Sequence, residues 1–277
     1  MEREASRLRH TRRRPNGLNP VGGAPYSHGH RATDDATDSL RVRHSSEDWA
    51  NSMILTGLLG GSFNPAHKGH RRASLAAIEA LGLDEIWWLV SPGNPLKDAR
   101  GMAPLAARFA SARRIARGAP IRATAIEREL GTRYTADTLA ALVRRYPERR
   151  FVWLMGADNL AQFHRWRDWG KIAALVPIAV MSRPGYDGVA LKAPVWGWLR
   201  RFVRPAAMAR NWTRWRPPAL VLLDLPPDRT SATAIRAANP NWHEYVMTVF
   251  HNGALRDGVT RRSLNGPHRG RRQFARR

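Results

Sequence analysis

The sequence contains no cysteine and no long apolar segment. Without cysteine the chain can form no disulfide bond, no thiolate nucleophile and no cysteine-ligated metal site or cluster. No apolar run approaches the roughly 20 residues that a membrane-spanning helix needs, and no apolar stretch follows the first arginines as a secretory signal requires. We therefore expect a cytoplasmic protein with no membrane partner, whose chemistry rests on histidines, carboxylates, basic residues or a bound ion.

Acidic residues are also scarce, because 22 Asp and Glu stand against 46 Lys and Arg and leave a formal net charge of +24. Such an excess points to polyanions: nucleic acid, an anionic membrane surface or phosphorylated small molecules. Much of the charge lies near the ends, as at residues 12–14 and 269–272, where periodic apolar residues are lacking. We therefore expect a disordered basic extension at residues 1–52 and a basic tail at residues 251–277, rather than a nucleic-acid-binding arm.

The region between the ends, residues 53–250, alternates between strand-like and helix-like stretches, and Met53 at its start is an alternative first residue for the natural protein. Strands are predicted at residues 54–59, 85–90, 121–126, 151–155, 176–181 and 219–223. Helices are predicted at residues 67–81, 104–117 and 135–146, with Thr135 as a cap, and a short one near residues 242–250. Such alternation predicts an α/β fold, a Rossmann-like doubly wound parallel sheet in a single domain.

A segment rich in tryptophan and arginine spans residues 195–216. Basic residues among aromatic ones can bind single-stranded nucleic acid by stacking and charge. The structural interpretation is that the tryptophans pack on the domain while the arginines face water, and we favour it because the segment lacks the spacing of a known nucleic-acid module.

The stretch GSFNPAHKGH at residues 61–70 directly follows the first predicted strand. Glycines let backbone N–H groups approach phosphate oxygens, and the N-terminus of a helix adds a partial positive charge of about half a unit. His67 and His70 lie three positions apart, on one face of the first helical turn, so both can reach one polyphosphate. A bare pair of this spacing could also bind a metal or be structural, but the strand and glycine turn before it favour phosphate binding.

This stretch resembles the phosphate-binding signature of the nucleotidyltransferase superfamily that carries a His-x-Gly-His motif. Near the C-terminus, residues 230–236 read TSATAIR and are similar to the second signature of that superfamily, Ile-Ser-Ser-Thr-x-Ile-Arg. The resemblance implies that Ser231 caps a helix and that Thr233 and Arg236 help to hold the β- and γ-phosphates of ATP. Thr230 and Ala232 depart from the pattern, since they replace an apolar residue and a serine.

Three blocks in the middle of the chain, residues 134–139, 155–166 and 182–186, resemble bacterial nicotinate-nucleotide adenylyltransferases, and the match covers about residues 53–238. By position it implies that Asp158 holds the ribose of ATP and that Trp166 stacks on the nicotinate ring. Arg167 stands where an aromatic residue is common in this family. Taken alone, Asp158 could be only a helix cap and Trp166 only a core residue, but both occur in order with the two phosphate motifs.

The resemblance implies three groups of site residues. The catalytic residues are His67, His70 and Arg236. The ATP-binding residues are Gly60, Gly61, Ser62, Phe63, Gly156, Asp158, Ser231 and Thr233. The residues that bind the second substrate are Asn94, Lys97, Thr135 and Trp166.

The implied reaction is attack by the 5′-phosphate of nicotinate mononucleotide on the α-phosphorus of ATP, with Mg²⁺ carried mainly by the ATP phosphates and water. We expect no metal site built from protein ligands alone. Two alternatives keep the chemistry and change the acceptor, to nicotinamide mononucleotide or to pantetheine phosphate. Trp166 argues against pantetheine, which has no aromatic ring to stack. The alternative from another class is a nucleic-acid-binding protein that uses the basic ends and residues 195–216.

Overall fold

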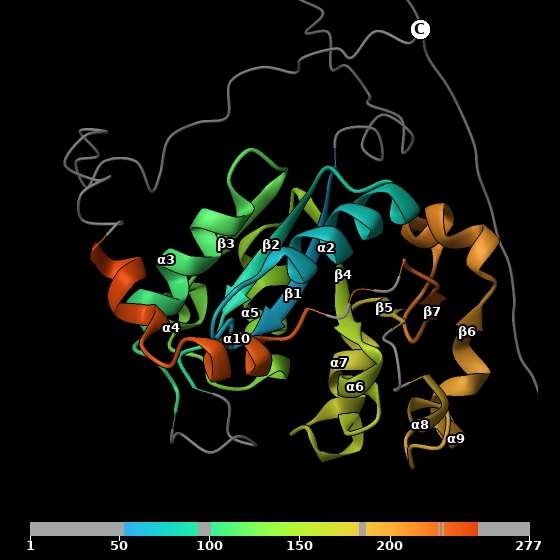
Figure 1. Ribbon diagram of the computed structural model, residues 1–277. Helices are drawn as coiled ribbons and strands as arrows, with labels where there is room; N and C mark the ends of the chain where they lie inside the picture. The colour runs from blue at the N-terminus through green and yellow to red at the C-terminus, as the bar shows by residue number, and fades with distance from the viewer. Residues whose placement is uncertain (1–52, 94–100, 183–186, 227, 229, 249–277) are drawn as a thin grey trace, which may run out of the picture. The chain divides into compact units, whose positions relative to one another are not determined.

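A parallel sheet forms the centre of the described part of the chain (Figure 1). The computed structural model describes residues 53–93, 101–182, 187–226, 228 and 230–248, which belong to one compact unit. The strands are β1 (Ile54–Gly61), β2 (Glu85–Val90), β3 (Ile121–Thr124), β4 (Arg149–Gly156), β5 (Ile178–Met181), β6 (Val203–Arg204) and β7 (Leu220–Leu223). They lie in the order β3-β2-β1-β4-β5-β7-β6, and every neighbouring pair is parallel. This arrangement confirms the predicted doubly wound fold, and the order reverses between β1 and β4.

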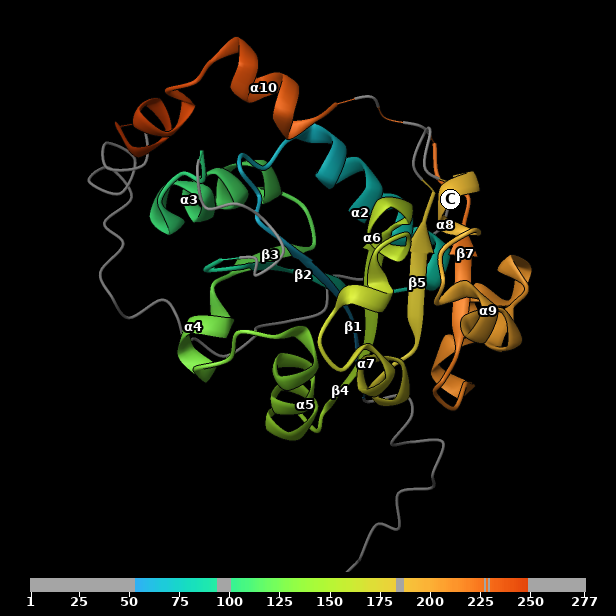
Figure 2. The ribbon, with the colours of Figure 1, turned by 90° about the horizontal axis from the view of Figure 1, so that it is seen from below.

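Helices cover both faces of the sheet, with α2 and α3 on one side and α5 and α7 on the other (Figure 2). The helices of the first face are α2 (Lys68–Leu81), α3 (Leu105–Ala116) and η3 (Ala206–Arg214). Those of the second face are α5 (Thr135–Arg145), α7 (Trp169–Leu175) and α9 (Trp196–Leu199). The remaining helical elements are α4 (Ile126–Leu130), α6 (Ala157–Leu160), η1 (Phe163–Arg165), α8 (Asp187–Ala190), η2 (Arg200–Phe202), α10 (Ala232–Ala238) and residues 242–248.

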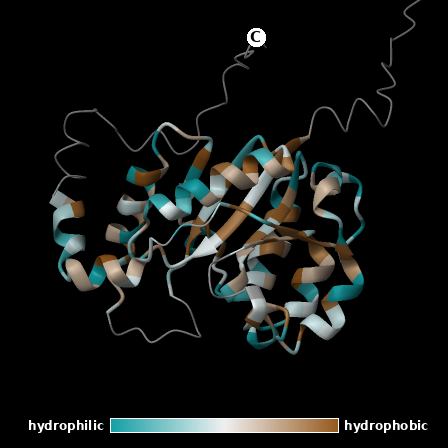
Figure 3. Cartoon of the chain, turned by 45° about the vertical axis from the view of Figure 1, so that its right-hand side comes forward, coloured by the Kyte–Doolittle hydropathy of each residue, from teal (hydrophilic) through white to brown (hydrophobic). Residues whose placement is uncertain are grey.

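The central strands are mostly apolar, because both faces of the sheet are buried there. In β2, Trp87 belongs to one hydrophobic cluster and Trp88 to the other, and they are 1% and 0% exposed. Successive side chains of a strand point to opposite faces, so this adjacent pair packs against both helix layers. In Figure 3 much of the sheet is brown, whereas the helices are mixed in colour.

The structure differs from the predicted elements in several places, and three of them bear on the site or the sheet. The strand expected at residues 121–126 ends at Thr124, and Ile126 instead begins α4, which stops at Gly131 with a φ of 64°. Thr135 is the first residue of α5 rather than its cap, because Tyr134 occupies the cap position. A seventh strand, β6, was not predicted, because two residues carry no recognisable period.

The tryptophan and arginine segment packs as the structural interpretation predicts. Trp212 is 1% exposed and its Nε1 donates to the carbonyl oxygen of Leu81 at 3.0 Å. Trp198 packs edge-on against Trp169, with ring centroids 5.3 Å apart. The six arginines of the segment are all exposed: Arg200, Arg201, Arg204, Arg210, Arg214 and Arg216. Within the described ranges, no helix is both long and apolar enough to cross a membrane.

Candidate active site

A cavity of about 560 Å³ opens where the strand order reverses, beyond the carboxyl ends of β1 and β4. This is the position at which doubly wound sheets bind ligands. Every predicted site residue that the structure describes lines it: Gly60, Gly61, Ser62, Phe63, His67, His70, Thr135, Gly156, Asp158, Trp166, Ser231, Thr233 and Arg236. Asn94 and Lys97 lie outside the described residues.

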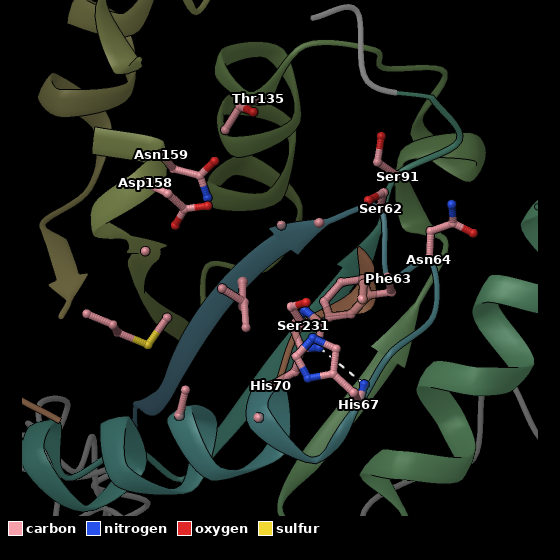
Figure 4. Close-up of a pocket in the computed structure, with 18 of the residues that line it drawn as sticks. Ser62, Phe63, Asn64, His67, His70, Ser91, Thr135, Asp158, Asn159 and Ser231 are labelled. Carbon is pink, nitrogen blue, oxygen red and sulfur yellow. Dashed lines mark hydrogen bonds between the residues drawn. The ribbon is translucent and has the colours of Figure 1, made fainter. Parts of the chain in front are cut away.

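The two histidines stand at the start of α2. The backbone N–H of His67, the cap residue, donates to Nδ1 of His70 at 3.2 Å. Since Nδ1 accepts this bond, the ring proton of a neutral His70 sits on Nε2, which makes Nε2 a donor. The His70 ring lies between His67 and Phe63, with centroids 3.8 Å and 5.0 Å away. Figure 4 shows both rings grouped with Phe63 and Ser231.

The loop between β1 and α2 is fixed in a backbone conformation that non-glycine residues rarely adopt. Phe63 has a φ of 47°, and its ring stacks on Trp88 with centroids 5.0 Å apart. The side chain of Asn64 donates to the carbonyl oxygen of Gly101 at 2.9 Å and accepts from the N–H of Ala103 at 3.2 Å. These contacts hold the loop in a strained shape, which is typical of ligand-binding sites.

Arg108 of α3 holds the same loop from behind. It is 1% exposed, and its guanidinium group makes bonds only to backbone carbonyl oxygens among the described residues. Nη1 donates to Ser62 at 2.8 Å and to Ser91 at 2.7 Å, so one group joins the loops that follow β1 and β2. Burial lowers the pKa of this guanidinium group below its usual value.

The opposite wall comes from α10 and the loop before it. Ser231 caps this helix as predicted, since its Oγ accepts from the N–H of Ala234 at 3.1 Å. Arg236 donates to the carbonyl oxygen of Asn64 at 2.7 Å and to Oγ1 of Thr233 at 3.3 Å. Arg236 therefore connects the two segments that carry the phosphate-binding motifs, although they are far apart in the sequence.

Two glycines keep the floor of the cavity open. A Cβ at Gly60 would lie 2.6 Å from the Trp153 ring, and a Cβ at Gly156 would collide with Oδ1 of Asp158. Asp158 and Asn159 follow β4 and lie together, apart from the histidines, in Figure 4. A side chain at either glycine would thus displace a residue that lines the cavity.

The third wall is aromatic and basic. The Trp166 ring packs edge-on against Phe163 and Trp153, with centroids 5.5 Å and 6.2 Å away. It is only partly buried, and it lines the cavity. The guanidinium group of Arg167 lies 4.5 Å from the centroid of the Tyr134 ring. Trp166 is thus both a packed residue and a cavity residue, so the two interpretations of it are compatible.

Glu127, the second residue of α4, also lines the cavity, although it is not among the predicted site residues. It is 9% exposed, and burial raises its pKa to about 7, although interactions with the hydroxyl groups of Ser91 and Thr138 oppose that shift. Its sequence neighbours give no signal, because Glu127 directly follows the strand predicted at residues 121–126 and belongs to none of the motifs. Arg108 was missed as well, and its only signal is that Ser111 and Ala112, on the same helical face, are small.

We expect the Glu127→Gln variant to be more stable than the wild type at about pH 8 and to lose this advantage in acid. The folded-state pKa of about 7 lies above the usual value of 4.5, so the folded protein binds this proton more tightly than the unfolded chain does. The resulting stability is present below about pH 4.5 and is lost as the pH rises through about 7. The pKa difference between the folded and unfolded states corresponds to on the order of 3 kcal/mol of unfolding free energy. Urea unfolding at about pH 5 and about pH 8 measures the free energy of unfolding of the wild type and the variant. The same stability difference between the two proteins at both pH values would contradict the expectation.

Comparison with known proteins adds independent information. Residues 58–238 match the model of a family described as cytidylyltransferase-like. The chain is 59% identical over 216 residues to a probable nicotinate-nucleotide adenylyltransferase from Erythrobacter litoralis, which covers 78% of this chain and 97% of that protein. It is 53% identical over 184 residues to a protein of the same name from Cereibacter sphaeroides, covering 66% of this chain and 97% of that protein.

A solved structure shares the fold. It is the nicotinic acid mononucleotide adenylyltransferase of Plasmodium falciparum in complex with NaAD, with a TM-score of 0.51 and 15% sequence identity. The similarity covers 71% of this chain and 96% of that one. At this identity the likeness supports the fold, and the sequence relatives carry the assignment to a family.

Proposed function

The chain belongs to the cytidylyltransferase-like family and, within it, to the nicotinate-nucleotide adenylyltransferases, and we propose that it transfers AMP from ATP to nicotinate mononucleotide. The products are nicotinate adenine dinucleotide and pyrophosphate. One observation carries the proposal: His67 and His70, Ser231 and Arg236, and Trp166 line a single cavity at the switch point of the sheet. Such a cavity can hold a triphosphate at one end and an aromatic ring at the other.

The protein's first task is to bind the phosphates of ATP. The N-terminus of α2 and the Nε2–H of His70 supply donors on one side, and Arg236 and Thr233 supply them on the other. Charge grows on the bridging oxygen and on pyrophosphate as the bond to the α-phosphorus breaks. Donors already fixed in place stabilise that charge without reorganisation, and this is usually the largest contribution to catalysis.

The second task is to align the acceptor. The 5′-phosphate of nicotinate mononucleotide is already a nucleophile, so the reaction needs no general base and depends on alignment. The exposed face of Trp166 is suited to stack on a pyridine ring. Thr135 at the start of α5 lines the same cavity. We assign Asn94 and Lys97 to the mononucleotide as well, from the sequence match alone.

A magnesium ion is suited to this chemistry, since it neutralises phosphate charge. Among the described residues no group of three or more His, Asp or Glu is placed to hold a metal ion. We therefore assign the ion mainly to the ATP phosphates and water, with the protein binding the phosphates that carry it.

We assign this activity to a domain at residues 53–250, with residues 1–52 and 251–277 as basic extensions. The family match at residues 58–238 and the packed core within the described residues support these bounds. In residues 195–216, Trp212 is buried and the other three tryptophans are partly buried against the core, while the arginines are exposed, which favours a packing role for this segment over nucleic-acid binding.

The test is pyrophosphate release from ATP, compared side by side with nicotinate mononucleotide, nicotinamide mononucleotide and phosphopantetheine as acceptors. We expect the highest kcat/KM with nicotinate mononucleotide, and dinucleotide formation in equal amount to pyrophosphate. Release that does not depend on the acceptor, or a preference for phosphopantetheine, would overturn the proposal.

A further inference from the structure

The carboxyl group of Glu127 is enclosed in the cavity wall without a full set of partners. The residue is 9% exposed and lines the cavity from α4. Its Oε2 atom has no hydrogen-bond partner among the described residues. A buried polar atom without a partner costs free energy, so its presence in a binding cavity points to a ligand that completes its bonds.

The position of Glu127 places it beside the acceptor's part of the cavity. Its carboxyl group interacts with Ser91, at the end of β2, and with Thr138 of α5. The Thr138 hydroxyl donates to the carbonyl oxygen of Tyr134 at 3.2 Å, and the Tyr134 ring contacts Arg167, next to Trp166. These contacts run from Glu127 to Arg167, the residue that follows Trp166 in the sequence, and Glu127 and Trp166 line the same cavity.

Burial, and not a neighbouring charge, determines the protonation state of Glu127. The elements packed most extensively against α4 are β2 and α5. The titratable or charged residues on these three elements are Arg128, Glu129, Glu85, Asp137, Arg144 and Arg145. Glu85 accepts a bond from Arg149; Arg128, Glu129 and Asp137 are exposed, and the two arginines of α5 lie in its last turn. Arg133 lines the same cavity but is exposed, and Arg108 bonds to the backbone of Ser91 instead.

We propose that Glu127 is a specificity-determining residue, which in its neutral form donates a hydrogen bond to the carboxylate on the pyridine ring of the acceptor. The inference rests on the proposed function, because it needs a pyridine mononucleotide in the cavity. The terminal torsion of a glutamate is broad, so the carboxyl group can turn either oxygen toward the ligand. The ligand carboxylate supplies the acceptor that the buried carboxyl group lacks.

The protonation state of Glu127 makes the choice between acid and amide acceptors depend on pH. Burial raises the pKa of Glu127 to about 7, so the donor form predominates below neutral pH and the carboxylate form above it. An ionised Glu127 repels a ligand carboxylate but accepts a bond from the N–H₂ group of a carboxamide. Preference for the acid over the amide should therefore fall as the pH rises.

The experiment compares wild type and Glu127→Gln, with kcat/KM measured for nicotinate and nicotinamide mononucleotides from about pH 6 to about pH 8. Glutamine keeps the shape and a permanent N–H donor but does not titrate in this range. With the acid as acceptor, we expect the kcat/KM of the wild type divided by that of the variant to fall about tenfold from about pH 6 to about pH 8. A group with a pKa of about 7 loses most of its proton over this interval. The ratio cancels the ionisation of the substrate phosphates.

Glu129→Gln is the matched control, since it makes the same change at an exposed position of the same helix. It should follow the wild-type profile. Parallel pH profiles for wild type and Glu127→Gln would overturn the inference while leaving the proposed function intact. A wild-type protein that forms no dinucleotide from nicotinate mononucleotide at any pH would instead overturn the proposed function.

Discussion

Replacing His70 by alanine is expected to lower turnover by about a hundredfold or more, with the fold intact. The Nδ1 atom of His70 accepts the N–H of His67, so Nε2 carries the ring proton of the neutral form, and the residue lines the cavity. In enzymes with an oxyanion hole, loss of one preorganised donor to developing charge costs about 100- to 1000-fold in kcat. Steady-state turnover at saturating ATP measures the effect, and circular dichroism checks the fold.

Two further substitutions separate the donor from the helix cap. Asparagine at this position keeps an acceptor for the His67 N–H but has no donor at the position of Nε2, so His70→Asn should be as slow as His70→Ala. Glutamine can place an N–H close to that position, and His70→Gln should recover part of the rate. His164→Ala is the control, because His164 is exposed and does not line the cavity. Near-normal turnover of His70→Ala would contradict the assignment.

Replacing Arg108 by lysine is expected to lower the free energy of unfolding by about 3 kcal/mol or more, although the charge is kept. The guanidinium group donates to Ala103, Ser62, Ser91 and Pro92 at 2.7 to 3.1 Å. An ammonium group has three donors and no planar fork, so it cannot reach all four carbonyl oxygens. Each buried carbonyl oxygen left without a donor costs about 1 to 3 kcal/mol.

The same change should also affect the reaction, because Arg108 positions the loops after β1 and β2. We expect KM for ATP to rise and kcat to fall, since Ser62 lies in the phosphate loop. Urea unfolding and steady-state kinetics measure the two effects. Arg114→Lys, on the same helix but at an exposed position, is the control and should change neither. An Arg108→Lys protein with wild-type stability and kinetics would show that the four bonds contribute little.

The sheet could be predicted from the sequence because its strands are short apolar runs separated by helical periods. Trp87 and Trp88 illustrate the point, since two adjacent buried tryptophans fit only a strand covered on both faces. The two phosphate motifs could be located because glycine, histidine and serine occur at spacings that a strand end and a helix start require. All of the predicted site residues within the described ranges line one cavity.

Arg108 and Glu127 could not be found in the same way, because their roles depend on burial. A sequence shows an arginine in a helix and a glutamate near a strand, and both types are usually exposed. Only the packing of α3 behind the phosphate loop buries the first, and only the early end of β3 at Thr124 places the second in the cavity wall. The burial of both residues depends on contacts between segments that are far apart in the sequence, and local sequence periodicity does not reveal such contacts.

The outermost strands have a consequence for aggregation. β6 has two residues and β3 has four, and both are edges of the sheet. Arg204 ends β6 and is followed by Pro205, while Arg122 is exposed on β3. Short edges with a charge or a following proline offer few unpaired N–H and C=O groups to a strand from another molecule. Both edge strands of this parallel sheet therefore disfavour pairing with a strand of another molecule, and such pairing is a common route to aggregation.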